Sequence, residues 1–168
     1  KKLTINILSS SLHRTTMLTS MVFFILIAAQ FFGIVFRGLG GDSLLEDFIA
    51  NLQLEPFWIL ASLMLLLFVL GFFLDFLEIC FIVLPIILPV LLKLEYNILW
   101  VTILIAINLQ TSFLTPPFGF ALFYLKGVTP PEIKTSHIYK GVAPFILIQL
   151  IVLLIIAKYP DLALWLPA

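Results

Sequence analysis

Apolar residues fall into four long runs along the chain, separated by short polar segments. A helix needs about 20 apolar residues to cross the hydrocarbon core of a bilayer. We therefore predict transmembrane helices over residues 17–35 and 142–158, a helical hairpin over 57–92 and a broken transmembrane helix over 98–125. Over residues 42–54 apolar positions recur at helical spacing opposite acidic ones, which predicts a short helix lying along the membrane surface.

The run over residues 57–92 is too long for a single crossing. Two arrangements fit it: two full crossings with a tight turn, or a re-entrant hairpin whose tip stops inside the membrane. Its only charged residues, Asp75 and Glu78, lie near its centre, and Pro85 and Pro89 weaken its second arm as a regular spanning helix. An acid at the bilayer centre costs roughly 2.5–3.5 kcal/mol unless it faces protein or water. We therefore favour the re-entrant hairpin.

The run over residues 98–125 is interrupted by Thr115-Pro116-Pro117, followed by Gly119. Both prolines lack a backbone donor and clash with the preceding helical turn, and Gly119 adds backbone freedom. Carbonyls freed at membrane depth must be buried in protein or line a polar cavity, and many transporters build ion and substrate sites in this way. The alternative is a proline kink whose carbonyls are satisfied by neighbouring Ser or Thr hydroxyls.

Composition places the chain in a membrane and excludes several functions. Hydrophobic residues make up 62% of it and charged residues 11%, against roughly 25% charged in soluble domains. The apolar runs do not alternate as β-barrel strands do. A net charge of zero gives no support to nucleic-acid binding, and one cysteine and two distant histidines provide neither a disulfide nor zinc or haem spacing. No nucleophile–base pair or phosphate-binding loop predicts an enzyme.

Charge predicts the orientation of the helices. Basic residues concentrate on one side of the predicted spans: Lys1, Lys2, Arg14, Lys126, Lys134 and Lys140. The positive-inside rule then puts the N-terminus and the 126–140 loop in the cytoplasm. The hairpin over 57–92 would enter from the outside face.

Two motifs in this order carry a family resemblance. The first is Gly71-Phe-Phe-Leu-Asp75, with prolines downstream, and the second is the stretch over 108–119, Asn-Leu-Gln-Thr-Ser-Phe-Leu-Thr-Pro-Pro-Phe-Gly. Together they resemble the C-terminal half of the large membrane subunit, of the DctM type, of tripartite ATP-independent periplasmic (TRAP) transporters. The resemblance covers essentially the whole chain.

This resemblance implies an all-α integral membrane fold that forms one inverted repeat of an elevator-type permease of the ion-transporter superfamily, in the bacterial inner membrane. The N-terminal repeat is absent, and the polar opening carries no signal sequence, so we expect a fragment or one half of a two-part permease. Expected partners are that missing repeat, a small four-helix membrane subunit, a periplasmic substrate-binding protein and membrane lipid. The expected substrate is an organic acid such as a C4-dicarboxylate.

The resemblance also implies Na⁺ as the coupling ion, without any other cofactor, bound at the hairpin tip and the helix break. Candidate residues for this Na⁺ site are Gly71, Ser112, Thr115, Pro116, Pro117 and Gly119. Candidates for the substrate path or the hairpin tip are Asp75, Asn108, Gln110 and Thr111, with Thr15 and Thr16 as further Na⁺ candidates. Hydroxyls and freed carbonyls suit a hard cation and bind it weakly enough for release.

Each candidate also has a structural interpretation. Asp75 compensates a cation, caps the turn or pairs with a positive group in the missing half. The polar side chains over 108–111 line the substrate path or form hydrogen bonds between helices. Thr15 and Thr16 either face a cation or bond to backbone carbonyls at a helix start.

We expect the membrane component of a Na⁺-coupled, binding-protein-dependent importer of organic acids. Two alternatives stay open: a Na⁺/dicarboxylate symporter that needs no binding protein, and a non-transporting fragment or assembly subunit.

Overall fold

The computed structural model describes residues 4–51, 53–116, 120–130 and 132–165, and all the regular secondary structure within these ranges is helical. Within these ranges, three helical segments are long and apolar enough to cross a membrane: α1 (Ile5–Gly38), Phe76–Lys93 and α8 (Thr135–Lys158). Two shorter apolar helices, α3 (Pro56–Leu70) and α6 (Ile98–Leu114), lie between them. These lengths and compositions are those of an integral membrane protein.

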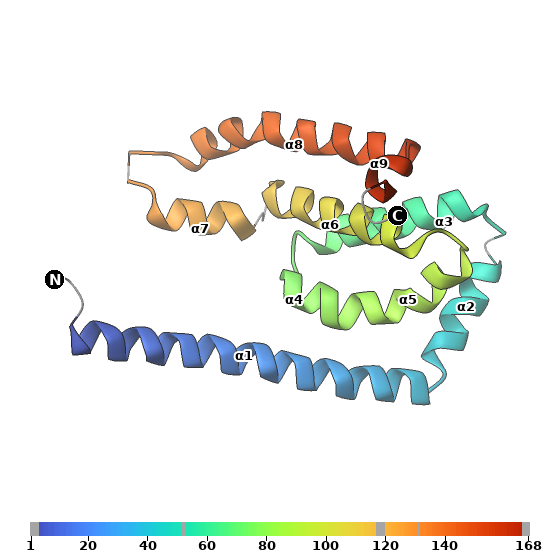
Figure 1. Ribbon diagram of the computed structural model, residues 1–168, viewed down its shortest axis with the longest axis horizontal. Coiled ribbons are helices and arrows are strands. Elements are labelled where there is room, and N and C mark those ends of the chain that lie inside the picture. The colour runs from blue at the N-terminus through green and yellow to red at the C-terminus, as the bar shows by residue number, and fades with distance from the viewer. Residues whose placement is uncertain (1–3, 52, 117–119, 131, 166–168) are drawn as a thin grey trace.

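The first helix is longer than its apolar run. α1 begins at Ile5, where Thr4 caps it by accepting a hydrogen bond from the backbone N–H of Ile7 at 3.4 Å. The polar stretch before the predicted span at 17–35 contains neither glycine nor proline, so nothing ends the helix there. After α1, Gly40 adopts a φ of +78°, a conformation that favours glycine, and α2 (Gly41–Asn51) leaves in a new direction (Figure 1).

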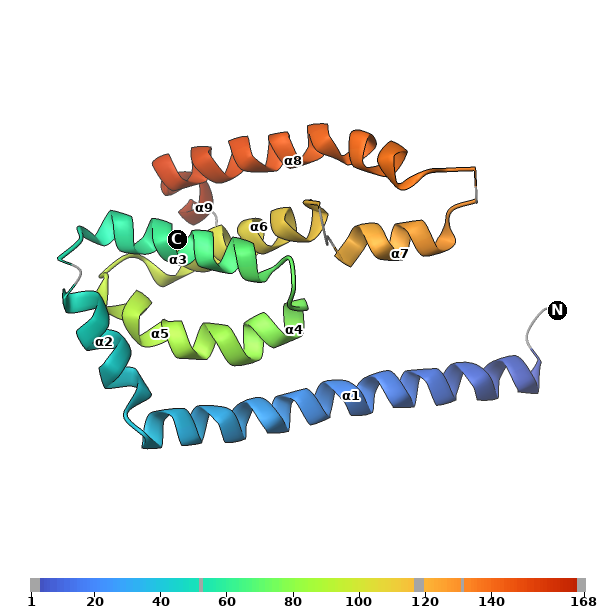
Figure 2. The ribbon, with the colours of Figure 1, turned by 180° about the vertical axis from the view of Figure 1, so that it is seen from behind.

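A helical hairpin follows α2. Its first arm is α3, and its second arm consists of α4 (Phe76–Glu78), the π-helical turn η1 (Ile79–Val83) and α5 (Leu84–Lys93). The arms run in opposite directions, and the open ends of both lie near α2 (Figure 1). The turn between them lies alongside the middle of α1 in both ribbon views (Figure 2).

Proline explains the π-helical turn of the second arm. Pro85 has no backbone N–H and its ring needs room beside the preceding turn. In the widened turn just before it, the N–H of Leu84 donates to the carbonyl of Ile79, one residue further back than in an α-helix. The second arm thus stays helical through Pro85 and Pro89.

The broken helix forms the centre of the molecule. α6 ends at Leu114, and α7 (Phe120–Val128) continues in a similar direction beyond the interruption (Figure 1). α6 packs against α3 on one side and α8 on the other, whereas α1 packs against α4 and η1. The indole Nε1 of Trp100 donates to the carbonyl of Ile156 at 2.8 Å and ties α6 to α8. The core is therefore built mainly from α3, α5 and α6.

The segments predicted to be cytoplasmic and those predicted to lie outside the membrane are at opposite ends of the molecule. The N-terminal end of α1 and the connection from α7 to α8 lie at one end (Figure 1). The C-terminal ends of α1 and α8 lie at the other, together with α2. This arrangement agrees with the basic residues at 126–140 sharing a side with the N-terminus.

Candidate functional site

The turn of the hairpin packs directly against the end of α6. Gly71, at the end of α3, is buried, and so is Ser112 in the last turn of α6. A Cβ atom added to Gly71 would lie 2.0 Å from Ser112 Oγ and 2.9 Å from Ser112 Cβ, closer than such atoms approach in proteins. Glycine thus permits the contact, and the structure brings together the two predicted parts of the site.

The helix ends beside this contact. Thr115 leaves the helical conformation, with φ −91° and ψ 127°, as expected for a residue that precedes proline. Its backbone N–H donates to the carbonyl of Ser112 at 3.0 Å, closing the last turn. Pro116 follows and is half-buried, whereas Pro117 and Gly119 lie outside the described residues.

Three hydroxyls in this last part of α6 donate back to its own carbonyls. Thr111 Oγ1 donates to Ile107, Ser112 Oγ to Leu109 and Thr115 Oγ1 to Thr111, at 2.7 to 2.8 Å. This is the pattern expected for Ser and Thr inside an apolar helix. Each hydroxyl proton is thereby directed away from the break, and each oxygen keeps lone pairs that can bind a cation.

The amides near the break have different surroundings. Asn108 is only 3% exposed, and its Nδ2 donates to the carbonyl of Met64 in α3 at 2.7 Å. This bond fastens the hairpin to α6 one turn before Ser112. Gln110 is exposed, on a part of α6 that faces away from this core.

Asp75 caps the second arm of the hairpin. Its Oδ1 accepts from the N–H of Phe76 at 2.6 Å, and Glu78 Oε2 accepts from the N–H of Asp75 at 3.2 Å. The pair forms a reciprocal capping box. Of the interpretations open for Asp75, the structure therefore shows the cap.

The first helix does not contribute to this cluster. Thr15 and Thr16 are exposed on α1, which packs mainly against α2 and against α4 and η1 of the hairpin. In the described part of the chain, no group of three His, Cys, Asp or Glu side chains comes close enough to hold a metal ion. The ligands that the cluster offers are hydroxyl and carbonyl oxygens, which suit a hard monovalent cation rather than a transition metal.

Two features of this region are not evident from residue spacing. The bond from Asn108 to Met64 uses a backbone acceptor on another helix, which the sequence does not mark. Pro85 is the one weak indication in the sequence of the π-helical turn over Ile79–Val83, because a helix that continues past a proline must widen or bend before it.

The sequence profile of the family described as "Tripartite ATP-independent periplasmic transporter, DctM component" matches residues 1–162. The chain belongs to the DctM family of TRAP transporter permeases. This family consists of transporter components, not of enzymes.

Individual DctM relatives are distant but similar over most of the chain. The sialic acid TRAP transporter permease protein SiaT of Haemophilus influenzae is 27% identical over 168 residues, 99% of this chain and 27% of SiaT. The C4-dicarboxylate TRAP transporter large permease protein DctM of Pseudomonas aeruginosa is 27% identical over 89% of this chain and 35% of its own length. The isethionate TRAP transporter permease protein DctMQ of Oleidesulfovibrio alaskensis is 29% identical over 88% of this chain and 23% of its own length.

The chain thus spans about a quarter to a third of the length of these relatives. Their names assign different substrates to them: sialic acid, C4-dicarboxylates and isethionate. All three substrates are organic acids.

Proposed function

We propose that this chain is the C-terminal half of the large permease subunit of a Na⁺-coupled TRAP transporter, which imports an organic acid across the bacterial inner membrane. The observation that carries the proposal is the contact of Gly71 with Ser112. It places the turn of the hairpin against the end of a helix that proline interrupts inside an apolar run.

The chemistry of the break suits a sodium ion. Pro117 has no N–H to give to the carbonyl of Phe113, four residues before it, and the carbonyl of Ser112 accepts only the Thr115 N–H in place of a bond from Pro116, so that it keeps a second lone pair. The C-terminal end of a helix also carries partial negative charge, which attracts a cation. Together with the hydroxyls of Ser112 and Thr115, these carbonyls supply several oxygen ligands without a formal charge.

The same break offers a place for the carboxylate of a substrate. α7 begins at Phe120, and the N-terminal end of a helix carries partial positive charge and free N–H groups. In broken-helix transporters, such half-helix ends point at anionic substrate groups. An organic acid and a sodium ion would then bind on opposite sides of one interruption.

A re-entrant hairpin is supported by the relative lengths of the helices. α3 has 15 residues, about 22 Å, whereas α1 has 34 residues, about 51 Å. The turn of the hairpin lies beside the middle of α1, and both of its arms open toward one end of the molecule (Figure 1). We place this turn inside the bilayer, where an elevator movement would carry it together with the broken helix.

The remaining part of the transporter would complete the site. We propose that the other inverted repeat provides a second hairpin and broken helix, that a small four-helix subunit braces the permease, and that a periplasmic protein delivers the substrate. The names of the relatives support organic acids as the substrate class. They give no reason to choose among sialic acid, C4-dicarboxylates and isethionate for this chain.

Uptake into proteoliposomes tests the proposal. The complete permease, reconstituted with its binding protein, should accumulate substrate only under an inward Na⁺ gradient, and a K⁺ gradient of equal size serves as the control. Unchanged uptake after an ionophore collapses the Na⁺ gradient would overturn sodium coupling. Full uptake without the binding protein would instead favour the symporter alternative.

A further inference from the structure

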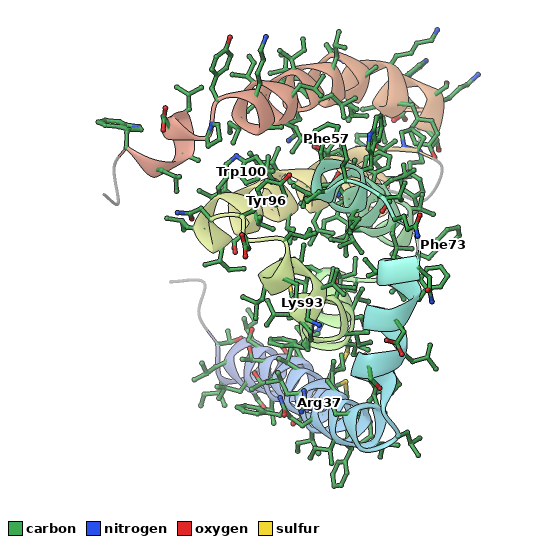
Figure 3. The ribbon with its side chains drawn as sticks, turned by 90° about the vertical axis from the view of Figure 1, so that its right-hand side faces the viewer. Arg37, Phe57, Phe73, Lys93, Tyr96 and Trp100 are labelled. Atoms are coloured by element: carbon green, nitrogen blue, oxygen red, sulfur yellow. The ribbon has the colours of Figure 1, made fainter. Side chains whose placement is uncertain are left out.

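A small cavity lies between α1 and the second arm of the hairpin, where α1 packs against the π-helical turn. Arg37, in the last turn of α1, lines it together with Phe81 and Ile82 of the π-helical turn and Pro85 of α5. Figure 3 shows Arg37 on α1, beneath the second arm. The space that the centre of a water molecule can occupy in this cavity is about 10 Å³, which is room for one water.

The Arg37 side chain runs back along α1 toward the middle of the helix. Its Nη2 and Nη1 atoms would lie 3.6 and 3.8 Å from a Cβ atom added to Gly33, one turn earlier. This direction follows the tilt of side chains toward the N-terminal end of a helix. Arg37 is exposed overall, yet in the described part of the chain none of the guanidinium N–H groups has a hydrogen-bond acceptor or a carboxylate beside it.

The π-helical turn has carbonyls that need a donor. The N–H of Leu84 donates to the carbonyl of Ile79, five residues back, and α5 then continues with its own α-helical bonds. Between these two bond patterns, the three carbonyls over 80–82 can receive only the N–H of Ile86, because Pro85 has none. Two of these three carbonyls therefore lack a backbone donor. Both of the residues by which the turn lines the cavity belong to this set.

We propose that Arg37 is a positioning residue, which fastens the hairpin to α1 through one water molecule in this cavity. The water accepts from the guanidinium and donates its two protons to the two carbonyls that have no backbone donor. About three hydrogen bonds are usual for a buried water, and a bridging water is nearly as favourable in enthalpy as a direct bond.

The bridge gives direction to a contact that is otherwise apolar. The other side chains of α1 at this cavity, Ala29 and Phe32 among them, are apolar, and apolar contacts do not by themselves fix one register. A guanidinium that meets two carbonyls through a water does fix it, and so sets where the second arm rests along α1. This role is separate from the proposed cation site and does not depend on whether sodium drives transport.

Thermal unfolding of the complete permease in detergent tests the bridge by a double-mutant cycle. Arg37→Met keeps a long side chain but removes its donors, and should lower the melting temperature by several degrees. Pro85→Ala supplies an N–H to the turn, so Arg37→Met should cost much less in that background. Arg14→Met, at an exposed position near the other end of α1, is the control and should change little in either background. Equal losses from Arg37→Met in both backgrounds would overturn the proposal.

A lipid phosphate is the other partner that a basic residue near the end of a transmembrane helix could have. The partner of Arg37 in the bridge belongs to the chain itself. The loss of melting temperature in Arg37→Met should therefore be the same in delipidated detergent as in phospholipid nanodiscs. A loss that occurs only with phospholipid would contradict the bridge and assign Arg37 to a headgroup.

Cys80 reports on the same contact well below the melting temperature. It is the only cysteine of the chain and lies in the π-helical turn that packs against α1. In a permease without other cysteines, N-ethylmaleimide should modify Cys80 several-fold faster in Arg37→Met than in the unsubstituted protein. Arg37→Lys keeps N–H donors on a long side chain and should restore most of the protection, whereas Arg14→Met should leave the rate unchanged. An unchanged rate in Arg37→Met would show that α1 stays on the turn without Arg37, against the proposal.

Discussion

Gly71 and Ser112 approach so closely that no side chain fits between the hairpin turn and the end of α6. The contact joins two segments that lie far apart in sequence, and it lies beside the point where α6 ends before Pro116. It therefore sets how near the turn comes to the proposed cation.

Gly71→Ala should loosen this contact. The added methyl would overlap Ser112 Oγ, and overpacking of this kind typically costs about 1–3 kcal/mol. We expect a lower melting temperature in detergent and slower substrate uptake. Gly141→Ala on α8, where an added Cβ meets nothing within 4 Å, is the matched control and should leave both unchanged. Equal behaviour of the two variants would mean that the hairpin moves aside freely.

Thr115→Val should raise the Na⁺ concentration needed for half-maximal uptake by tenfold or more, because it removes one proposed oxygen ligand while preserving shape. A lost hydrogen bond to a charged group is worth about 1.5–3 kcal/mol. Thr115→Ser keeps the hydroxyl and should restore most of the affinity. Thr102→Val removes a hydroxyl that makes the same kind of back-bond, to Ile98 at 2.8 Å on the exposed side of α6, and should have no effect. A similar change in both valine variants would contradict a ligand role for Thr115.

Asn108→Leu should lower the stability of the permease by about 1 kcal/mol, within the range measured for hydrogen bonds between membrane helices. The bond it removes, from Asn108 to Met64, fastens α3 to α6. Gln110→Leu alters an exposed amide on the same helix and should leave thermal unfolding unchanged. If Asn108→Leu left stability intact but lowered uptake, Asn108 would act on the substrate path instead.

Two substitutions of Asp75 test its capping role separately from its negative charge. Asn is as good an N-cap as Asp, so Asp75→Asn should keep both the fold and uptake. Asp75→Ala removes the acceptor and should cost about 1 kcal/mol of stability. Loss of uptake in Asp75→Asn, in a protein that still melts normally, would show that the negative charge takes part in transport.

Local chemistry made the break and the turn predictable. Two consecutive prolines, Pro116 and Pro117, remove two neighbouring backbone donors and disfavour the helical conformation of Thr115, so the interruption after Leu114 follows from the sequence without any tertiary information. The cap at Asp75 is similarly local, since it depends on residues within one helical turn. The closeness of Gly71 to Ser112 was expected only because a family resemblance suggested that the two segments meet.

Tertiary choices were not predictable in this way. Hydrophobic spacing on α6 does not show that Asn108 faces α3 while Gln110 is exposed, because the helix is apolar on nearly all sides. The apolar run over 17–35 predicts a membrane span but not the start of α1 at Ile5, because helices continue through Ser and Thr in the absence of glycine or proline.

The π-helical turn over Ile79–Val83 has a rotational consequence for the hairpin. One extra residue in a turn rotates everything after it by about 100° relative to an uninterrupted α-helix. The second arm can therefore meet α1 through η1 and α2 through α5, using two differently oriented faces of one continuous segment. Deleting a single residue from this turn would leave a helix of nearly the same length whose last ten residues face the wrong neighbours.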